Sequence, residues 1–157
     1  MKLPNGITGF YDMELNQPPK MDSKLFKELC FTIITLNGGK ILAFKDPHYT
    51  VNFYEVEVEI YNKHLYILLN EHYTYLSIAA SVNLENITFI DEPQLYRDFG
   101  RYYKVICSYE LNKPVLIKEI NGMICLENRN ELNRAELEQI AHWKPKKIGG
   151  IVFNYWD

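Results

Sequence analysis

A strict alternation of apolar and acidic residues over Phe53 to Tyr61 constrains the fold of this chain more than any other feature. Successive side chains of a β-strand point to opposite faces of a sheet, so this pattern predicts a strand with one apolar and one acidic face. The apolar face carries Val56, Val58 and Ile60, and the acidic face carries Glu55, Glu57 and Glu59. A turn at Asn62-Lys63 and an apolar segment from His64 to Leu69 predict the returning strand of a hairpin. The chain is therefore expected to contain an antiparallel sheet.

The other strand-like segments extend this hairpin into a meander. They cover Lys40 to Phe44, Tyr73 to Val82, Asn86 to Ile90 and Tyr102 to Tyr109, with short edge strands at Val115 to Ile117 and Met123 to Leu126. The Asn121-Gly122 dipeptide predicts the turn between the two edge strands. A short helix is expected from Pro93 to Phe99, because proline is tolerated in the first turn of a helix. Residues 40–126 are thus expected to form mainly sheet.

Before the sheet, the sequence predicts an arm and a helix. Residues 1–20 are rich in proline and glycine and are expected to form an extended arm that lies on the domain. A helix is expected within residues 21–38, capped by Asp22 or Ser23 and ended by Gly38 and Gly39. Its apolar residues repeat at helical spacing and are Leu25, Phe26, Leu29, Ile33 and Leu36.

Residues 133–156 predict a helical closure that packs against the sheet. Asn133 and Glu136 form a capping-box pattern, and Pro145 is expected to end one helix and start another. Most chain ends of small domains are polar and fray, whereas this one stays apolar almost throughout. Its apolar residues are Ile148, Ile151, Val152, Phe153, Tyr155 and Trp156. Gly149 and Gly150 weaken a helix and indicate a close approach of the backbone to the sheet.

Taken together, these elements predict a single α+β domain over residues 1–157. Its architecture is an antiparallel β-sheet meander packed by an N-terminal helix and two C-terminal helices. A chain of 157 residues is long enough to bury a core of its own. The 12 tyrosines fit both an antiparallel sheet and a recognition surface.

Composition limits the classes of function. The chain has 17 basic and 20 acidic residues and a net charge of −3, so it lacks the basic excess typical of nucleic-acid binding. No apolar stretch approaches the roughly 20 residues that span a membrane, and no secretory signal is apparent, which favours a cytoplasmic location. Cys30, Cys107 and Cys125 are widely spaced and are expected to be reduced thiols. We expect no cofactor and no metal.

The adjacent residues Glu71 and His72 come closest to a catalytic pattern. The four histidines of the chain show none of the spacings typical of metal sites. A carboxylate and an imidazole can act as an acid/base couple, which leaves open a small hydrolase that uses Glu71 and His72. Adjacent residues of a strand point to opposite faces, however, so a loop pair in solvent is the expected arrangement.

The glutamate row, defined as Glu55, Glu57 and Glu59, is the best-defined polar feature of the sequence. Its carboxylates stand about 7 Å apart along the strand, too far for two of them to bind a small metal ion without a third element. Like charges in a row repel, so the row is not expected to stabilise the sheet. It predicts either a solvated sheet face or protected edge, or an acidic docking surface for a basic partner.

Several stretches of the chain resemble one known family. They are Lys2 to Asp12, Leu29 to Phe31, Ile67 to Ala80, Phe89 to Tyr96, and the ending LNRAELEQIAHWKPKKIGGIVFNYWD. In these stretches the chain resembles small bacterial immunity proteins, the cytoplasmic antidotes to polymorphic toxins, including LXG-type secreted toxins whose C-terminal domains are often nucleases. The chain departs from the family pattern at Gly149-Gly150, where the second position is expected to be acidic, and by an insertion around Ile117 to Asn128.

The resemblance implies that the chain binds the C-terminal domain of one cognate toxin, neutralises it, and catalyses no reaction. The motifs that carry it are structural, so the family supplies no contact residue for this chain. The glutamate row is the candidate partner-binding site on the residues alone. A dimeric scaffold or regulatory module that pairs through a sheet edge is a further alternative.

Overall fold

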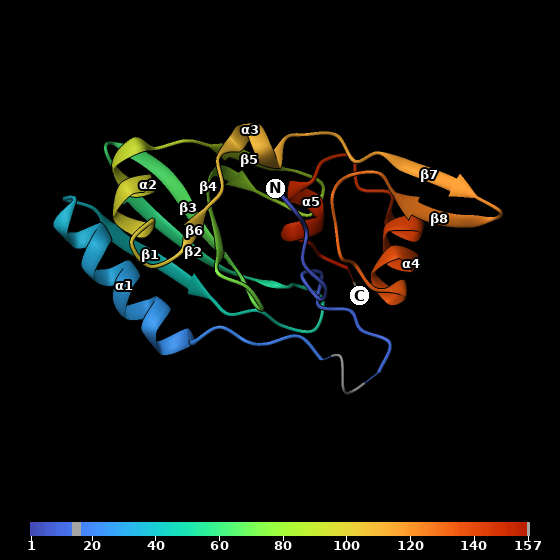
Figure 1. Ribbon diagram of the computed structural model, residues 1–157. Helices are drawn as coiled ribbons and strands as arrows, with labels where there is room; N and C mark the ends of the chain where they lie inside the picture. Colours follow the sequence, from blue (N-terminus) through green and yellow to red (C-terminus); the bar gives the residue numbers. More distant parts are fainter. Residues whose placement is uncertain (14–16, 157) are drawn as a thin grey trace.

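A six-stranded sheet organises the computed structural model, which describes residues 1–13 and 17–156 (Figure 1). The elements are α1 (Ser23–Leu36), β1 (Lys40–Lys45), β2 (Phe53–Ile60), β3 (Lys63–Asn70), β4 (Tyr75–Val82), β5 (Ile87–Ile90), α2 (Pro93–Phe99), β6 (Lys104–Val105), α3 (Ser108–Leu111), β7 (Ile117–Ile120), β8 (Met123–Leu126), α4 (Arg134–Trp143) and α5 (Gly149–Val152). Strands β1 to β5 form an antiparallel meander in sequence order, and β6 pairs in parallel with β4. This arrangement confirms the α+β class.

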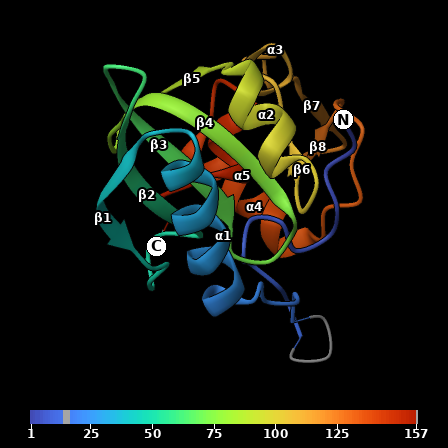
Figure 2. The same ribbon diagram turned by 90° about the vertical axis from the view of Figure 1, so that its left-hand side faces the viewer.

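One face of the sheet is covered by α1 and α2. Figure 2 shows both helices in front of the strands, with α4 and α5 behind them. The apolar residues of β2 that alternate with the glutamates point into this layer. The buried stripe of α1 consists of Phe26, Cys30, Ile33 and Ile34, whereas Leu25 and Leu36 are exposed. The expectation that Leu25 and Leu36 belong to the buried stripe was therefore wrong. The helix face that contacts the sheet is centred closer to Cys30 than the sequence pattern predicts.

The other face of the sheet is only partly covered. The C-terminal segment, residues 148–156, packs there against Phe53 of β2 and Phe89 of β5. The rings of both residues contact the Phe153 ring, with ring centroids 5.7 and 6.0 Å apart. The apolar residues of this segment are buried apart from Tyr155, which is half-buried. The expectation that the chain end packs into the core is therefore confirmed.

The end of the chain is less helical than the sequence predicts. Helix α4 begins with the expected capping box of Asn133 and Glu136, and it ends at Lys144 in the left-handed conformation, with φ +50°. Pro145 does not start a second helix, since α5 is a single turn that begins at Gly149. Two adjacent glycines have low helix propensity, which accounts for a helix of only one turn here.

Gly149 confirms the expected close approach to the sheet, and Gly150 does not. A Cβ atom on Gly149 would lie 2.2 Å from the Phe89 ring, whereas one on Gly150 would first meet Pro145 at 3.5 Å. We therefore expect Gly149→Ala to lower the free energy of unfolding by about 1–3 kcal/mol through overpacking. Gly150→Ala, the matched control, should be neutral or slightly stabilising because alanine favours the helix. Thermal unfolding of the two variants measures this difference, and equal melting would contradict the close packing.

The N-terminal residues do not form the predicted extended arm on the surface. Leu3, Ile7 and Thr8 are buried, and turns occupy this segment. Leu3 exchanges backbone hydrogen bonds with the chain just before α4, donating to Arg129 and accepting from Glu131. The segment is part of the core because it fills the space between the sheet end and α4. Residues 14–16 of the predicted arm lie outside the described residues.

Two predicted sheet segments differ in register or type. The β2–β3 turn is formed by Tyr61 and Asn62, both with positive φ, and lies one residue before the predicted position. Of the strand predicted over Tyr102 to Tyr109, only β6 is extended, and α3 follows it. Ser108 donates two hydrogen bonds to the Asp91 carboxylate, at 2.8 and 2.7 Å, which turns the chain away from the sheet.

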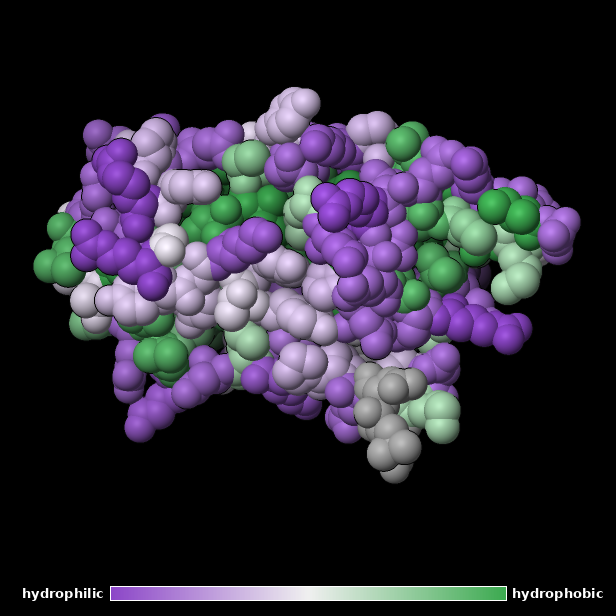
Figure 3. Space-filling view, viewed as in Figure 1, coloured by the Kyte–Doolittle hydropathy of each residue, from purple (hydrophilic) through white to green (hydrophobic). Residues whose placement is uncertain are grey.

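The predicted edge strands instead form a separate hairpin of β7 and β8. The Asn121-Gly122 turn is confirmed by positive φ at both residues, but the first strand is Ile117–Ile120 rather than 115–117. The hairpin projects beside α4 at one end of the molecule, where hydrophobic side chains gather at the surface (Figures 1 and 3). Its exposed large residues include Ile120 and Met123.

Candidate functional site

The glutamate row lies on the partly covered face of the sheet, opposite α1, as the alternation predicts. Strand β2 is flanked by β1 and β3, so the row does not lie on a sheet edge. Lys45 Nζ lies 3.5 Å from Glu55 Oε2, and the His64 imidazole contacts the Glu57 carboxylate. The side chains of Glu55 and Glu57 are 11% and 28% exposed, whereas Glu59 is exposed. Only Glu59 therefore fits the expectation of a solvated face.

A groove of about 580 Å³ lies over Glu55 and Glu57. We call it the acidic groove. Its other lining residues include Lys45, Tyr66, Leu84, Glu85 and Tyr155. The C-terminal segment covers Phe53 and Phe89, and Tyr155 of that segment lines the groove beside the glutamates.

Tyr155 connects the core to the acidic groove. Its ring packs edge-on against Phe53, with ring centroids 5.4 Å apart. Burial, and secondarily the charge of Glu55, raise the pKa of Tyr155 to about 12. The hydroxyl therefore keeps its proton at neutral pH and remains a hydrogen-bond donor beside the carboxylates.

A second groove, of about 370 Å³, adjoins the first. We call it the tryptophan groove, because both tryptophans of the chain line it, Trp143 from α4 and Trp156 from the C-terminal segment. The turn between β4 and β5, residues 83–86, also lines it. The two grooves share Leu84, Glu85 and Tyr155, so they form one continuous concave surface.

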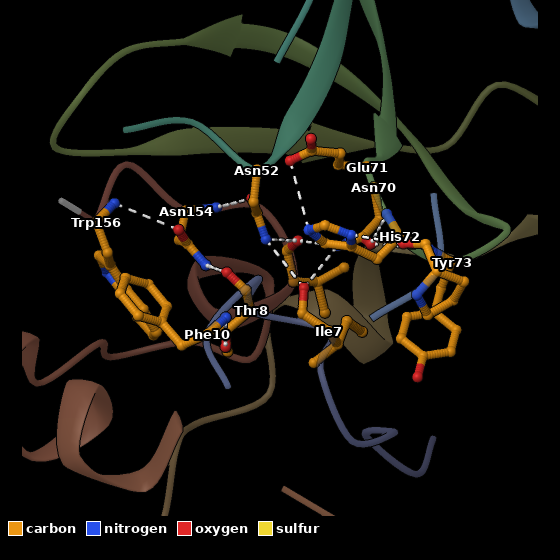
Figure 4. Close-up of polar contacts among 12 residues, drawn as sticks. Ile7, Thr8, Phe10, Asn52, Asn70, Glu71, His72, Tyr73, Asn154 and Trp156 are labelled. Atoms are coloured by element: carbon orange, nitrogen blue, oxygen red, sulfur yellow. Dashed lines mark hydrogen bonds and ion pairs between the residues drawn. The ribbon is translucent and has the colours of Figure 1, made fainter. Parts of the chain in front are cut away.

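The Glu71–His72 pair is not a loop pair in solvent, so that expectation was wrong. The two residues follow β3 in a bend, where the strand rule for opposite faces does not apply, and His72 is buried (Figure 4). Its Nδ1 donates to the carbonyl oxygen of Pro19 at 2.7 Å, and its Nε2 lies 3.4 Å from Glu71 Oε2. A groove of about 470 Å³ passes the pair. The Nδ1 hydrogen bond ties the segment around Pro19 to this bend, and Nε2 lies toward the Glu71 carboxylate.

Three buried asparagines hold the adjoining junction together. The amides of Asn52 and Asn70 each donate to the carbonyl oxygens of Ile7 and Val152. Figure 4 shows how Asn154 completes the junction, with its backbone N–H donating to Asn52 at 2.8 Å. Every one of these contacts crosses between distant segments, so the asparagines fix the N-terminal residues, the sheet and the chain end to one another.

The described residues contain no group of three or more His, Cys, Asp or Glu side chains that could hold a metal ion. Cys30 is buried in the α1 layer, where desolvation raises the pKa of its thiol. Cys107 and Cys125 are half-buried free thiols. In the described part of the chain, none of the helices has both the length and the apolar character needed to cross a membrane.

Comparisons of this chain with protein-family models, with curated proteins and with solved structures found no match. The geometry of the grooves and the resemblance of the stretches quoted above are therefore what bears on function.

The sequence located the glutamate row but missed the residues that surround it. Tyr66 could have been found, because it alternates with His64 on the acidic face of the hairpin. Tyr155 and Trp143 carry no such signal, since they reach the site from segments more than 70 residues away in the chain. Their place depends on tertiary packing alone.

Proposed function

We propose that this chain is an immunity protein that acts in the cytoplasm, where it binds and neutralises the C-terminal domain of a cognate secreted toxin. In one version of the proposal, that toxin domain is a nuclease. It acts by binding and not by catalysis. The observation that supports the proposal most is the acidic groove, a concave surface with two tyrosines and two partly buried carboxylates. Aromatic side chains in a hollow surface suit tight protein recognition, and the carboxylates suit a basic partner.

The partial burial of the glutamates favours the docking interpretation over simple solvation. A carboxylate that is already largely desolvated loses less hydration when a partner covers it. Lys45 and His64 hold Glu55 and Glu57 in place before binding, so less side-chain freedom remains to be lost. A preorganised acidic surface of this kind supports binding to a basic domain such as a nuclease.

Two alternatives have less support. A hydrolase that uses Glu71 and His72 needs an imidazole nitrogen directed at substrate, whereas Nδ1 donates to the Pro19 carbonyl oxygen and Nε2 lies toward the Glu71 carboxylate. A scaffold that dimerises through the outer strand needs an open edge, and β1 carries Lys40 and Lys45 at its ends and a bulge between Ile41 and Ala43. Lysines and bulges on edge strands oppose pairing with a second chain.

Complex formation tests the proposed function directly. The purified chain and the toxin domain encoded beside it are expected to form a 1:1 complex with nanomolar or tighter affinity, roughly −12 kcal/mol or beyond. Co-expression should also relieve the toxicity of that domain. Absence of association at micromolar concentration, together with no rescue of growth, would refute the immunity function.

Neutralising the glutamate row is expected to slow association with the toxin domain by about tenfold, because charges that line a docking surface steer encounter. The variant is Glu55→Gln with Glu57→Gln and Glu59→Gln, which keeps the side-chain shapes. Rising salt should shrink the difference, since charges are screened over about 8 Å at physiological ionic strength. Stopped-flow association rates at several salt concentrations measure the effect.

A matched control separates the acidic face from net charge. Glu28→Gln with Glu119→Gln and Glu138→Gln also removes three negative charges, but at exposed positions away from the groove. This control is expected to change the association rate by less than about twofold. Equal slowing by both triple variants would mean that overall charge, and not the groove, attracts the partner.

A further inference from the structure

Three of the four charged side chains that line the tryptophan groove are basic, whereas three of the four that line the acidic groove are acidic. Lys144, Lys146 and Lys147 line it in the connection between α4 and α5. The lysine ion pairs found across residues 1–13 and 17–156 all belong to other lysines. In a chain of net charge −3, three neighbouring lysines that form no ion pair within the described part of the chain make a local cationic site.

The groove also exposes large apolar side chains from two separate segments. Leu84, at the turn between β4 and β5, is 77% exposed, and Trp143, at the end of α4, is 40% exposed. Trp156, which is nearly buried, lines the groove as well. An apolar side chain placed here would cover Leu84 and the Trp143 ring together, as anchor residues do in tight interfaces.

Lys144 has a backbone conformation that is uncommon for lysine. It lies at the C-terminal end of α4 with φ +50°, in the left-handed region that favours glycine or asparagine. The long cationic side chain therefore stands at this position despite the local backbone preference. That placement is consistent with a role for its charge in the groove.

We infer that the tryptophan groove receives an acidic segment of the same partner domain, with one large apolar side chain inserted between Leu84 and Trp143. This inference rests on the proposed function and adds a second contact to it. Two features select this occupant, namely the charge complementarity with the lysines and the continuity of the two grooves through Glu85 and Tyr155. The partner then carries a basic patch opposite the glutamates and an acidic patch opposite the lysines. The reversed orientation brings like charges together, so the two grooves fix how the partner docks.

Fluorine NMR of the tryptophans tests the inference. The chain contains only two tryptophans, so incorporation of 5-fluorotryptophan gives two resonances, which Trp143→Phe assigns. Unlabelled toxin domain is then added to the labelled chain. The Trp143 resonance is expected to shift and to lose its dependence on H₂O or D₂O solvent, because the partner covers the ring.

Charge reversal supplies the second measurement. Lys144→Glu with Lys146→Glu is expected to weaken the complex at least about tenfold. The matched control, Lys24→Glu with Lys118→Glu, changes exposed lysines at α1 and β7 and is expected to weaken it less than about twofold. Circular dichroism spectra of both variants verify that they fold.

The outcomes separate the two proposals. If no complex forms with the unmodified chain, the proposed function fails. If the complex forms while the Trp143 resonance stays unmoved, or while charge reversal leaves the affinity unchanged, the groove inference is overturned and the immunity function stands. A Trp143 shift that follows the concentration of this chain alone would assign the groove to a second copy, and would likewise overturn the inference.

Discussion

Deletion of residues 151–157 is expected to leave the free protein unfolded. The deletion removes Ile151, Val152, Phe153 and Trp156, all of which are buried in the core on the second sheet face. Each such side chain contributes about 1.5–3 kcal/mol, and together they match the 5–15 kcal/mol that stabilises a typical domain. The deletion also uncovers Phe53 and Phe89. Loss of a cooperative thermal transition by circular dichroism measures the effect.

Single substitutions in the same segment test this prediction in smaller steps. Trp156→Ala is expected to cost about 3–5 kcal/mol, since the ring is nearly buried and packs toward Phe10 with ring centroids 6.5 Å apart. Trp143→Ala is the matched control and should cost about 1 kcal/mol or less, because Trp143 is 40% exposed. A truncated chain that melts normally yet fails to bind the toxin domain would make the chain end a binding element instead of part of the core.

Local sequence patterns predicted the elements whose causes are local. The alternation in β2 placed all three glutamates on one face, and the capping box at Asn133 located the start of α4. Where a long-range contact decides the conformation, the same patterns failed. The Asp91 hydrogen bonds to Ser108 replace the predicted strand with α3, and no local signal reports a partner 17 residues away.

The candidate site shows the same division. The glutamate row was found because a period of two needs only neighbouring residues, whereas the grooves around it are made by the β4–β5 turn and the chain end meeting over the sheet. His72 was misjudged because the strand rule was applied to a bend, in which the ring turns back toward Glu71 and the carbonyl of Pro19. Helix periodicity likewise predicts that α1 is amphipathic but sets its buried line only to within one residue.

Among single substitutions of polar residues, we expect those of Glu136 to lower the stability of the protein most. Glu136 is fully buried, and its carboxylate accepts five hydrogen bonds. The donors are the backbone N–H groups of Gly6, Thr8 and Asn133, the Thr8 hydroxyl and the Asn133 amide, at 2.6 to 3.1 Å. The capping box of α4 thus also binds the N-terminal segment, and one carboxylate joins two parts of the chain about 130 residues apart.

Glu136→Ala is therefore expected to lower the free energy of unfolding by about 3–5 kcal/mol. Each buried donor left without a partner costs about 1–3 kcal/mol, and the N–H groups of Gly6 and Thr8 both lose theirs. Glu136→Gln keeps the shape but turns one acceptor into a donor that faces other donors, so it should cost about 2 kcal/mol. Urea unfolding followed by fluorescence measures both values.

Glu138→Ala provides the matched control two residues along the same helix. Its carboxylate is 66% exposed and pairs only with Arg134 among the described residues, so its removal should change stability by less than about 0.5 kcal/mol. If Glu136→Ala instead unfolds like this control, the other contacts of the N-terminal segment are sufficient to hold it. Hydrogen exchange at Gly6 and Thr8 distinguishes the two cases, because loss of the carboxylate should expose these amides well before global unfolding.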